Sequence, residues 1–265
     1  MAEGIDAEMN EYNGPNALPP LTPLDEAQDL IYQAWEEPAK RERKKLARQA
    51  LELSPDCADA YVILARDNTE TLAEALIYFE AGVRAGERAI GAALFNEEAG
   101  HFWLILETRP YMRARGGLAN TLWDMGRRQE AIDHYWDMLR LNEGDNQGIR
   151  YILAVCLLED KRDDELEKLL SLNANDGMAM LKYARALLAF RREGANREAA
   201  RYLQQAVKAN PHVPAYILGQ KRIPKERPPH IDWGGEREAA YVAAEIKHIW
   251  WQEDGAIHWL CNNAG

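Results

Sequence analysis

A pattern that recurs about every 34 residues constrains the fold of this chain more than any other feature of its sequence. Ala131, Glu165 and Ala199 are evenly spaced along the chain, and each opens the same short pattern. A large apolar or aromatic residue follows four positions later, and a small or apolar residue follows three positions after that. These offsets place all three residues on one face of a helix. A period of about 34 residues is typical of paired helices in the tetratricopeptide repeat, so the sequence predicts an all-α fold.

An earlier copy of the pattern shows where the period is interrupted. Ala75, Phe79 and Gly82 have the same internal spacing, but Ala75 precedes Ala131 by clearly more than one period. The excess over one period predicts an insertion at about 87–109. Helical hairpins are expected at 24–57, 58–86, 110–145, 146–176 and 177–212. A truncated sixth unit is expected at 236–265, with helices from Glu238 to Trp251 and from Asp254 to Leu260.

These units predict one continuous tetratricopeptide repeat domain over residues 23–265. Residues 1–22 hold three prolines and no helical period, so we expect an extended lead-in there. A Pro- and Gly-rich linker is expected at about 220–235. A single helical hairpin cannot bury its own apolar face, and stacked hairpins do so jointly. The predicted fold is therefore a right-handed superhelix, an α-solenoid with a concave inner side.

Charge and hydropathy exclude several classes of partner. The net charge is −11, which would repel a nucleic-acid backbone. The dense basic run between Lys40 and Arg48 is interpreted as a solvated helix face, with anionic membrane or nucleic-acid contact as the alternative. No apolar run approaches the roughly 20 residues needed to span a bilayer, and residues 1–11 show no secretory signal. We therefore expect a cytoplasmic protein that binds neither nucleic acid nor membrane.

No pattern for catalysis or metal binding stands out. Cys57, Cys156 and Cys261 lie far apart without a CxxC spacing, and the first two are interpreted as small buried hydrophobes. His248, His258 and Cys261 match no closed zinc pattern. No Gly-rich phosphate loop and no GxSxG elbow is present. The sequence therefore predicts a protein that is not an enzyme, with no catalytic residue, no metal and no cofactor.

Basic side chains recur at the positions expected to face the groove. In such repeats the first helix of each unit lines the concave side, through positions two, five, six and nine of that helix. The side chains expected there are Arg66, Arg113, Asn120, Arg150, Tyr151, Lys182 and Arg185. Because arginine binds carboxylates through two parallel hydrogen bonds, we hypothesise that the groove receives an acidic peptide or a C-terminal carboxylate. The alternative is a solvated face on which these arginines pair with acidic residues of the chain itself.

The insertion provides a second candidate site. His101, Glu107 and Arg109 combine ionic and aromatic character close to Arg113. Loops on a repeat scaffold often carry binding specificity. The other interpretation is a longer helical hairpin that buries Trp103, Leu104 and Leu106.

Three tryptophans near the C-terminus, Trp250, Trp251 and Trp259, allow two interpretations. They form the core and cap of the last unit, or they form a surface for a partner or a second copy of the chain.

Several segments resemble a known family. The suppressor of tumorigenicity 7 family is similar at residues 60–65, 74–79, 85–87, 210–218 and 253–260. Residues 100–113 and 145–151 are similar to a bacterial group of cytoplasmic tetratricopeptide proteins. The resemblance covers about residues 45–260 and implies the repeat fold without a settled biochemical activity. Fold and resemblance together favour a non-catalytic scaffold or adaptor that binds a partner segment in its groove. The alternative is a small-ligand or enzymatic module that uses residues 100–113.

Overall fold

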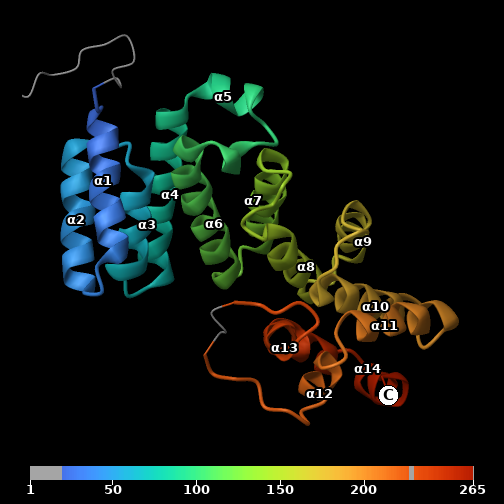
Figure 1. Ribbon diagram of the computed structural model, residues 1–265. Helices are drawn as coiled ribbons and strands as arrows, with labels where there is room; N and C mark the ends of the chain where they lie inside the picture. The colour runs from blue at the N-terminus through green and yellow to red at the C-terminus, as the bar shows by residue number, and fades with distance from the viewer. Residues whose placement is uncertain (1–19, 227–229, 265) are drawn as a thin grey trace, which may run out of the picture.

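The structure is a computed structural model that describes residues 20–226 and 230–264. Most of the expected lead-in, residues 1–19, and part of the expected linker therefore lie outside the described residues. The described chain is all-α and contains no β-strand, as predicted for a tetratricopeptide-type solenoid (Figure 1).

The helices follow one another as antiparallel pairs joined by short turns. The N-terminal pairs are α1 (Pro23–Glu36) with α2 (Lys40–Leu53), and α3 (Ala58–Asp67) with α4 (Leu72–Ile90). The central pairs are α6 (Arg109–Asp124) with α7 (Arg128–Leu141), and α8 (Ile149–Glu159) with α9 (Asp163–Leu172). The C-terminal pairs are α10 (Ala179–Glu193) with α11 (Arg197–Ala209), and α13 (Glu236–Gln252) with α14 (Ala256–Asn263). A short helix, α12 (Val213–Ile217), precedes the linker.

Local chemistry sets several of these helix ends. Thr22 and Thr71 each begin a helix through a capping box, in which the threonine side chain and the acidic residue three positions on satisfy each other's backbone N–H groups. Gly126 ends the turn between α6 and α7 with φ of +77°, a backbone conformation that favours glycine. The second helix of this unit begins at Arg128.

The repeat pattern supplies the core. Ala131, Tyr135 and Met138 on α7 and Ala199, Leu203 and Ala206 on α11 are all at most 1% exposed. One buried cluster runs from α3 to α14, and a smaller one joins α1, α2 and α3. Each unit thus buries its apolar face against its neighbours, as a solenoid requires. No helix within the described residues has the length and apolar character needed to cross a membrane.

The insertion folds differently from a helical hairpin. After α4, the chain forms α5 (Ala92–Glu97) and two single turns, η1 (Phe102–Leu104) and η2 (Leu106–Thr108). Phe102 is fully buried, whereas Leu104 and Leu106 are 68% and 60% exposed. The interpretation that placed Leu104 and Leu106 in the core is therefore wrong. The 3₁₀ turns direct Phe102 inward, where it packs near Phe95 and Tyr111.

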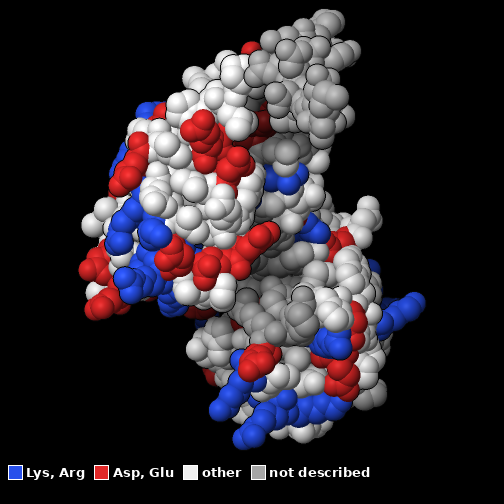
Figure 2. Space-filling view, turned by 60° about the vertical axis from the view of Figure 1, so that its left-hand side comes forward, with Lys and Arg blue, Asp and Glu red and all other residues white. Residues whose placement is uncertain are grey.

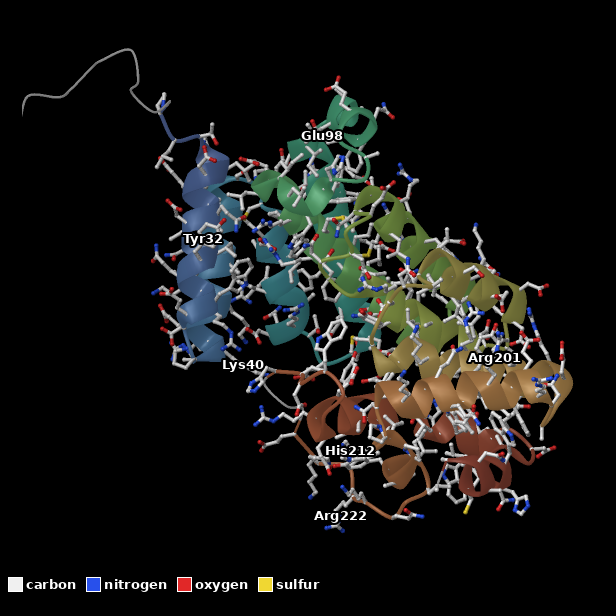
Figure 3. The ribbon with its side chains drawn as sticks, turned by 45° about the vertical axis from the view of Figure 1, so that its right-hand side comes forward. Tyr32, Lys40, Glu98, Arg201, His212 and Arg222 are labelled. Atoms are coloured by element: carbon white, nitrogen blue, oxygen red, sulfur yellow. The ribbon has the colours of Figure 1, made fainter. Side chains whose placement is uncertain are left out.

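The C-terminal tryptophans divide between core and surface. Trp250 and Trp259 are buried and stacked, with ring centroids 6.2 Å apart. Trp251 is 56% exposed and its Nε1 donates to the carbonyl of Ile217 over 2.8 Å. In Figure 3, His212 and Arg222, which lie before and after α12, are at the bottom of the view, and Tyr32 on α1 is higher up on the left. The core-and-cap interpretation accounts for two of the three rings.

Alkylation of the native protein with iodoacetamide near neutral pH should modify Cys261 and spare Cys57 and Cys156. The thiolate is the reacting species. Burial raises the pKa of the Cys57 thiol to about 11 and also raises the pKa of the Cys156 thiol, while Cys261 is exposed. Peptide mass spectrometry measures the modification at each site. Labelling of Cys156 without denaturant would contradict the burial of this thiol.

Candidate partner-binding groove

A groove of about 440 Å³ opens between the middle of the chain and its C-terminal helix pair. We call it the central groove. Its walls come from α6, α7, α8 and α13, so residues that are distant in sequence face the same space. The residues that line it include Asn120, Trp123, Asp124, Tyr135, Tyr151, Glu159, Tyr241, Ala244, Glu245 and His248.

Aromatic and acidic side chains dominate this lining. Asp124, Glu159 and Glu245 carry the carboxylates, and no lysine or arginine is among the described residues that line the groove. The Nε2 atom of His248 lies 3.4 Å from Glu159 Oε2 and so connects α13 to α8. The groove therefore offers flat apolar surface together with negative charge.

The floor of the groove is held by internal contacts. Tyr135 Oη donates to Asn120 Oδ1 over 2.6 Å, which ties α7 to α6. Arg128 lies over the Trp123 ring at 4.8 Å and also bonds to Glu159 over 3.2 Å. Trp123 is thus held by a cation–π contact, which preorganises one wall before any ligand binds.

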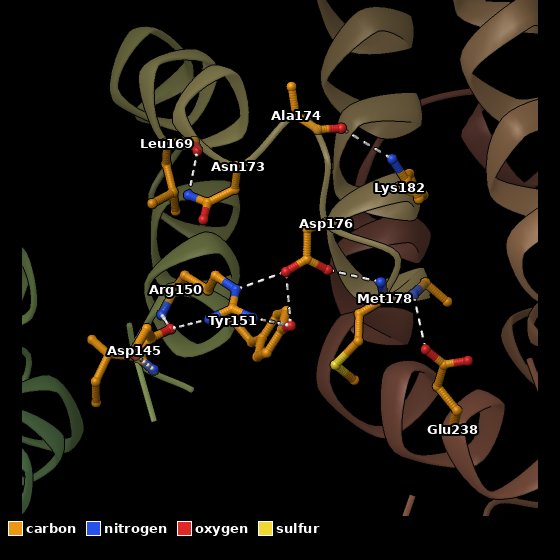
Figure 4. Close-up of polar contacts among 12 residues, drawn as sticks. Asp145, Arg150, Tyr151, Leu169, Asn173, Ala174, Asp176, Met178, Lys182 and Glu238 are labelled. Carbon is orange, nitrogen blue, oxygen red and sulfur yellow. Dashed lines mark hydrogen bonds and ion pairs between the residues drawn. The ribbon is translucent and has the colours of Figure 1, made fainter. Parts of the chain in front are cut away.

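Arg150 belongs to a polar cluster rather than to the open groove (Figure 4). Its Nη1 donates to Asp145 over 2.8 Å and its Nε donates to Asp176 over 2.7 Å. The guanidinium also lies 4.4 Å from the centre of the Tyr151 ring, and Tyr151 Oη donates to Asp176 over 2.9 Å. Asp145 accepts from two N–H groups at the start of α8, and burial is the main cause that raises the pKa of its carboxyl. The cluster links α8 to the turn before α10.

Arg113 is likewise paired inside the chain. Its Nε and Nη2 donate to the two carboxylate oxygens of Asp59 over 2.7 and 2.6 Å. Asp59 is fully buried and also accepts from Gln28 over 3.1 Å. The ring of Trp35 lies 4.7 Å from the guanidinium. This bidentate pair joins α1, α3 and α6 and is a structural contact.

The remaining groove candidates have separate surroundings. Arg185 bonds to Glu167 over 3.1 Å, and Lys182 donates to the carbonyl of Ala174 over 3.4 Å. Arg66 is exposed at the end of α3. Of the seven positions expected to line one groove, Asn120 and Tyr151 are the two that line the central groove.

The three candidate residues of the insertion have separate surroundings. Arg109 donates to the carbonyl of Trp103 over 2.8 Å and lies over the Trp103 ring. His101 forms an isolated backbone bridge with Asn142. Glu107 is exposed beside α1. His101, Glu107 and Arg109 therefore have different neighbours.

Sequence reasoning missed the α13 wall of the central groove. Tyr241, Ala244, Glu245 and His248 belong to the last helix pair, and α13 packs against α8, α10 and α12. Their pattern in the sequence is that of any amphipathic helix. Only the packing of α13 against α8 in the folded chain brings them to the groove.

The fold defines a tetratricopeptide-type repeat protein, and comparison with known proteins gives the family. A model of the family described as ST7 protein matches residues 22–155, half of the chain. The chain belongs to this family. The suppressor of tumorigenicity 7 protein-like of Gallus gallus is 30% identical over 260 residues, and the alignment covers 87% of this chain and 45% of that protein. The ST7 homolog of Caenorhabditis elegans is 29% identical over 276 residues, covering 88% and 49%.

The chain thus spans about half the length of the curated relatives it matches. Among solved structures, YrrB, described as a tetratricopeptide repeat protein with an unusual peptide-binding site, is 21% identical. Its TM-score is 0.49, and the match covers 70% of this chain and 84% of that one.

Proposed function

We propose that this protein is a non-catalytic scaffold that binds a segment of a partner protein in the central groove. The observation that supports the proposal is the groove itself, whose aromatic walls are held in place by internal contacts. Tetratricopeptide-type solenoids present concave surfaces of this kind to partner segments. A groove whose aromatic walls are already held in place binds a segment at low entropic cost, because the walls need no reordering.

The ion pairs that the arginines form within the chain bear on the charge of the partner. An acidic partner was hypothesised from groove arginines, but Arg113, Arg150 and Arg185 already bond to carboxylates of the chain. An acidic segment would have to compete with those carboxylates, or use Arg66 and Lys182. The carboxylates that line the central groove favour a neutral or basic segment. Raising the salt concentration should weaken binding of a basic segment at this groove.

Tryptophan at position 244 should block the groove and reduce partner capture about tenfold or more. Ala244 is exposed on α13 and lines the groove, so the larger side chain occupies the space that a partner would fill. Affinity capture from native extract, with quantification of each retained protein, compares the wild type with Ala244→Trp. Proteins that the wild type retains and Ala244→Trp does not retain are the partners that bind in the groove.

The matched control is Ala93→Trp, which makes the same change on the exposed surface of α5, away from the groove. This control should retain the partners. Equal capture by the wild type and Ala244→Trp would contradict the proposal. A small molecule that raises the melting temperature of the wild type but not of Ala244→Trp would assign the groove to a small ligand instead.

Two further expectations remain part of the proposal. One is a cytoplasmic location. The other is self-association through the C-terminal tryptophans, for which the exposed Trp251 is the candidate contact. Size-exclusion chromatography of the wild type and Trp251→Ala tests it, and an unchanged elution volume would exclude this surface.

A further inference from the structure

A second groove lies at the N-terminal end of the chain, away from α13. Its volume is about 350 Å³. It is formed where α1 and α3 begin, where α4 ends and where η2 leads into α6. We call it the N-terminal groove. None of the described residues that line it also lines the central groove.

Large apolar side chains are left open to solvent along this groove. Leu21 is 63% exposed, Tyr32 on α1 is 49% exposed and Leu106 on η2 is 60% exposed. These residues come from separate parts of the chain, and the fold gathers them around one concavity. Exposed apolar side chains that converge on a concave surface mark an interaction site, whereas isolated ones need no explanation.

Acidic side chains border the apolar surface. Asp25, Asp29, Asp56 and Glu107 line the groove, and no lysine or arginine is among its described lining residues. Arg88 neutralises one of the four, because its Nε bonds to Asp56 over 2.7 Å. Asp25 caps α1, and the N–H of Thr22 holds the pKa of the Asp25 carboxyl below its usual value. Asp29 and Glu107 are exposed on opposite sides of the groove, on α1 and η2.

The local charge is not a consequence of a uniformly acidic surface. In Figure 2, which brings α1 and α2 forward, basic and acidic side chains are interspersed on the same part of the molecule. The basic run of α2, from Lys40 to Arg48, lies on the neighbouring helix. The absence of lysine and arginine from the described lining of the N-terminal groove therefore differs from the mixed charge of the surface around it.

We propose that the N-terminal groove is a docking site for an amphipathic segment of a partner protein that carries leucine-like residues on one face and lysine or arginine on its edges. The apolar face would cover Leu21, Tyr32 and Leu106, and the cations would reach Asp29 and Glu107. Residues 1–19 of this chain contain four acidic residues and no lysine or arginine, so their charge does not suit this groove. The site is separate from the central groove, and neither proposal depends on the other.

A synthetic peptide of leucine and lysine in amphipathic helical order is the probe, labelled for fluorescence anisotropy. The wild type should bind it, and added salt should weaken binding. The double variant Asp29→Lys/Glu107→Lys should weaken binding about tenfold, because two attractions become repulsions. The variant Leu106→Ser should weaken it by a similar factor, because the leucine no longer contributes apolar surface.

Each variant has a control that leaves the groove unchanged. Glu52→Lys/Asp254→Lys makes the same change in net charge at exposed positions elsewhere, and Leu104→Ser removes an exposed leucine that does not line the groove. Both controls should bind the peptide as the wild type does. The proposal is overturned if the wild type does not bind, if the controls lose as much affinity as the groove variants, or if a peptide with glutamate in place of lysine binds equally well.

A second copy of the chain is the other conceivable occupant, through the basic run of α2. Sedimentation of the wild type and of Asp29→Lys/Glu107→Lys distinguishes it. If the wild type forms dimers and the double variant does not, the assignment of the groove to a separate partner is overturned.

Discussion

Alanine in place of Glu238 should lower the free energy of unfolding by about 3–5 kcal/mol, because the substitution strands several buried donors at once. Glu238 is 1% exposed, although it lies in the first turn of α13. Its Oε1 accepts from the N–H of Ala179 over 2.9 Å, at the first residue of α10. Its Oε2 accepts from Asn210 Nδ2 over 2.9 Å and from the N–H of Gly234 over 2.7 Å.

The position of the carboxylate explains the size of this effect. The first N–H groups of a helix have no partner within the helix and carry partial positive charge, so an anion there stabilises α10. Each buried donor that loses its acceptor costs about 1–3 kcal/mol, and partial relaxation limits the total. Figure 4 shows the carboxylate of Glu238 directed at the start of α10.

Urea unfolding followed by circular dichroism measures the change. Glu238→Gln keeps an acceptor oxygen and should cost about 1–2 kcal/mol. Glu198→Ala removes an exposed glutamate on α11 and should change the stability by less than about 0.5 kcal/mol. A loss for Glu238→Ala no larger than that of Glu198→Ala would refute the structural role of this carboxylate.

The same network explains part of what the sequence could and could not predict. In the sequence, residues 210–218 stand out by their resemblance to the suppressor of tumorigenicity 7 family. The structure adds that Asn210 is fully buried and bonds to Glu238 and to the carbonyl of Gly235. Periodicity does not predict this contact, because it joins two turns that are far apart in the sequence.

The fold was predictable because it depends on a periodic pattern. Ala131, Tyr135 and Met138 repeat at fixed offsets, and each unit packs on the next by the same rule. The insertion lacks that period, and there the expected burial of Leu104 and Leu106 was wrong.

The groove was predictable only in part. Helical position predicted that Asn120 and Tyr151 face a groove, and both line the central groove, while their binding of a partner stays a prediction. Helical position could not identify the ion-pair partners of the arginines. Asp59 lies 54 residues before Arg113, and Asp176 lies 26 residues after Arg150. Arginine at an inward position therefore indicated a basic groove, while the folded chain uses these arginines to join its own helices.

Two adjacent glycines on α6 should respond to the same substitution with opposite signs. Gly117→Ala should lower the free energy of unfolding by about 2–3 kcal/mol, because the added Cβ would overlap the buried ring of Phe79. Gly116→Ala should raise it by about 0.5 kcal/mol, because its Cβ would meet only the end of the flexible Met138 side chain, at 3.4 Å. Both substitutions gain the same helix propensity. The difference between their free energies of unfolding therefore reports the packing of α6 against α4.

A double-mutant cycle identifies Phe79 as the cause. Phe79→Leu alone should cost about 1–2 kcal/mol, since a smaller side chain leaves part of the core unfilled. In the Gly117→Ala background the same change should cost much less or restore stability, because it removes the overlap, with a coupling energy of about 1–2 kcal/mol. Urea unfolding of the four proteins measures this coupling energy. Additive effects, or a Gly117→Ala variant as stable as Gly116→Ala, would mean that α4 and α6 do not approach as closely at Gly117 as the structure places them.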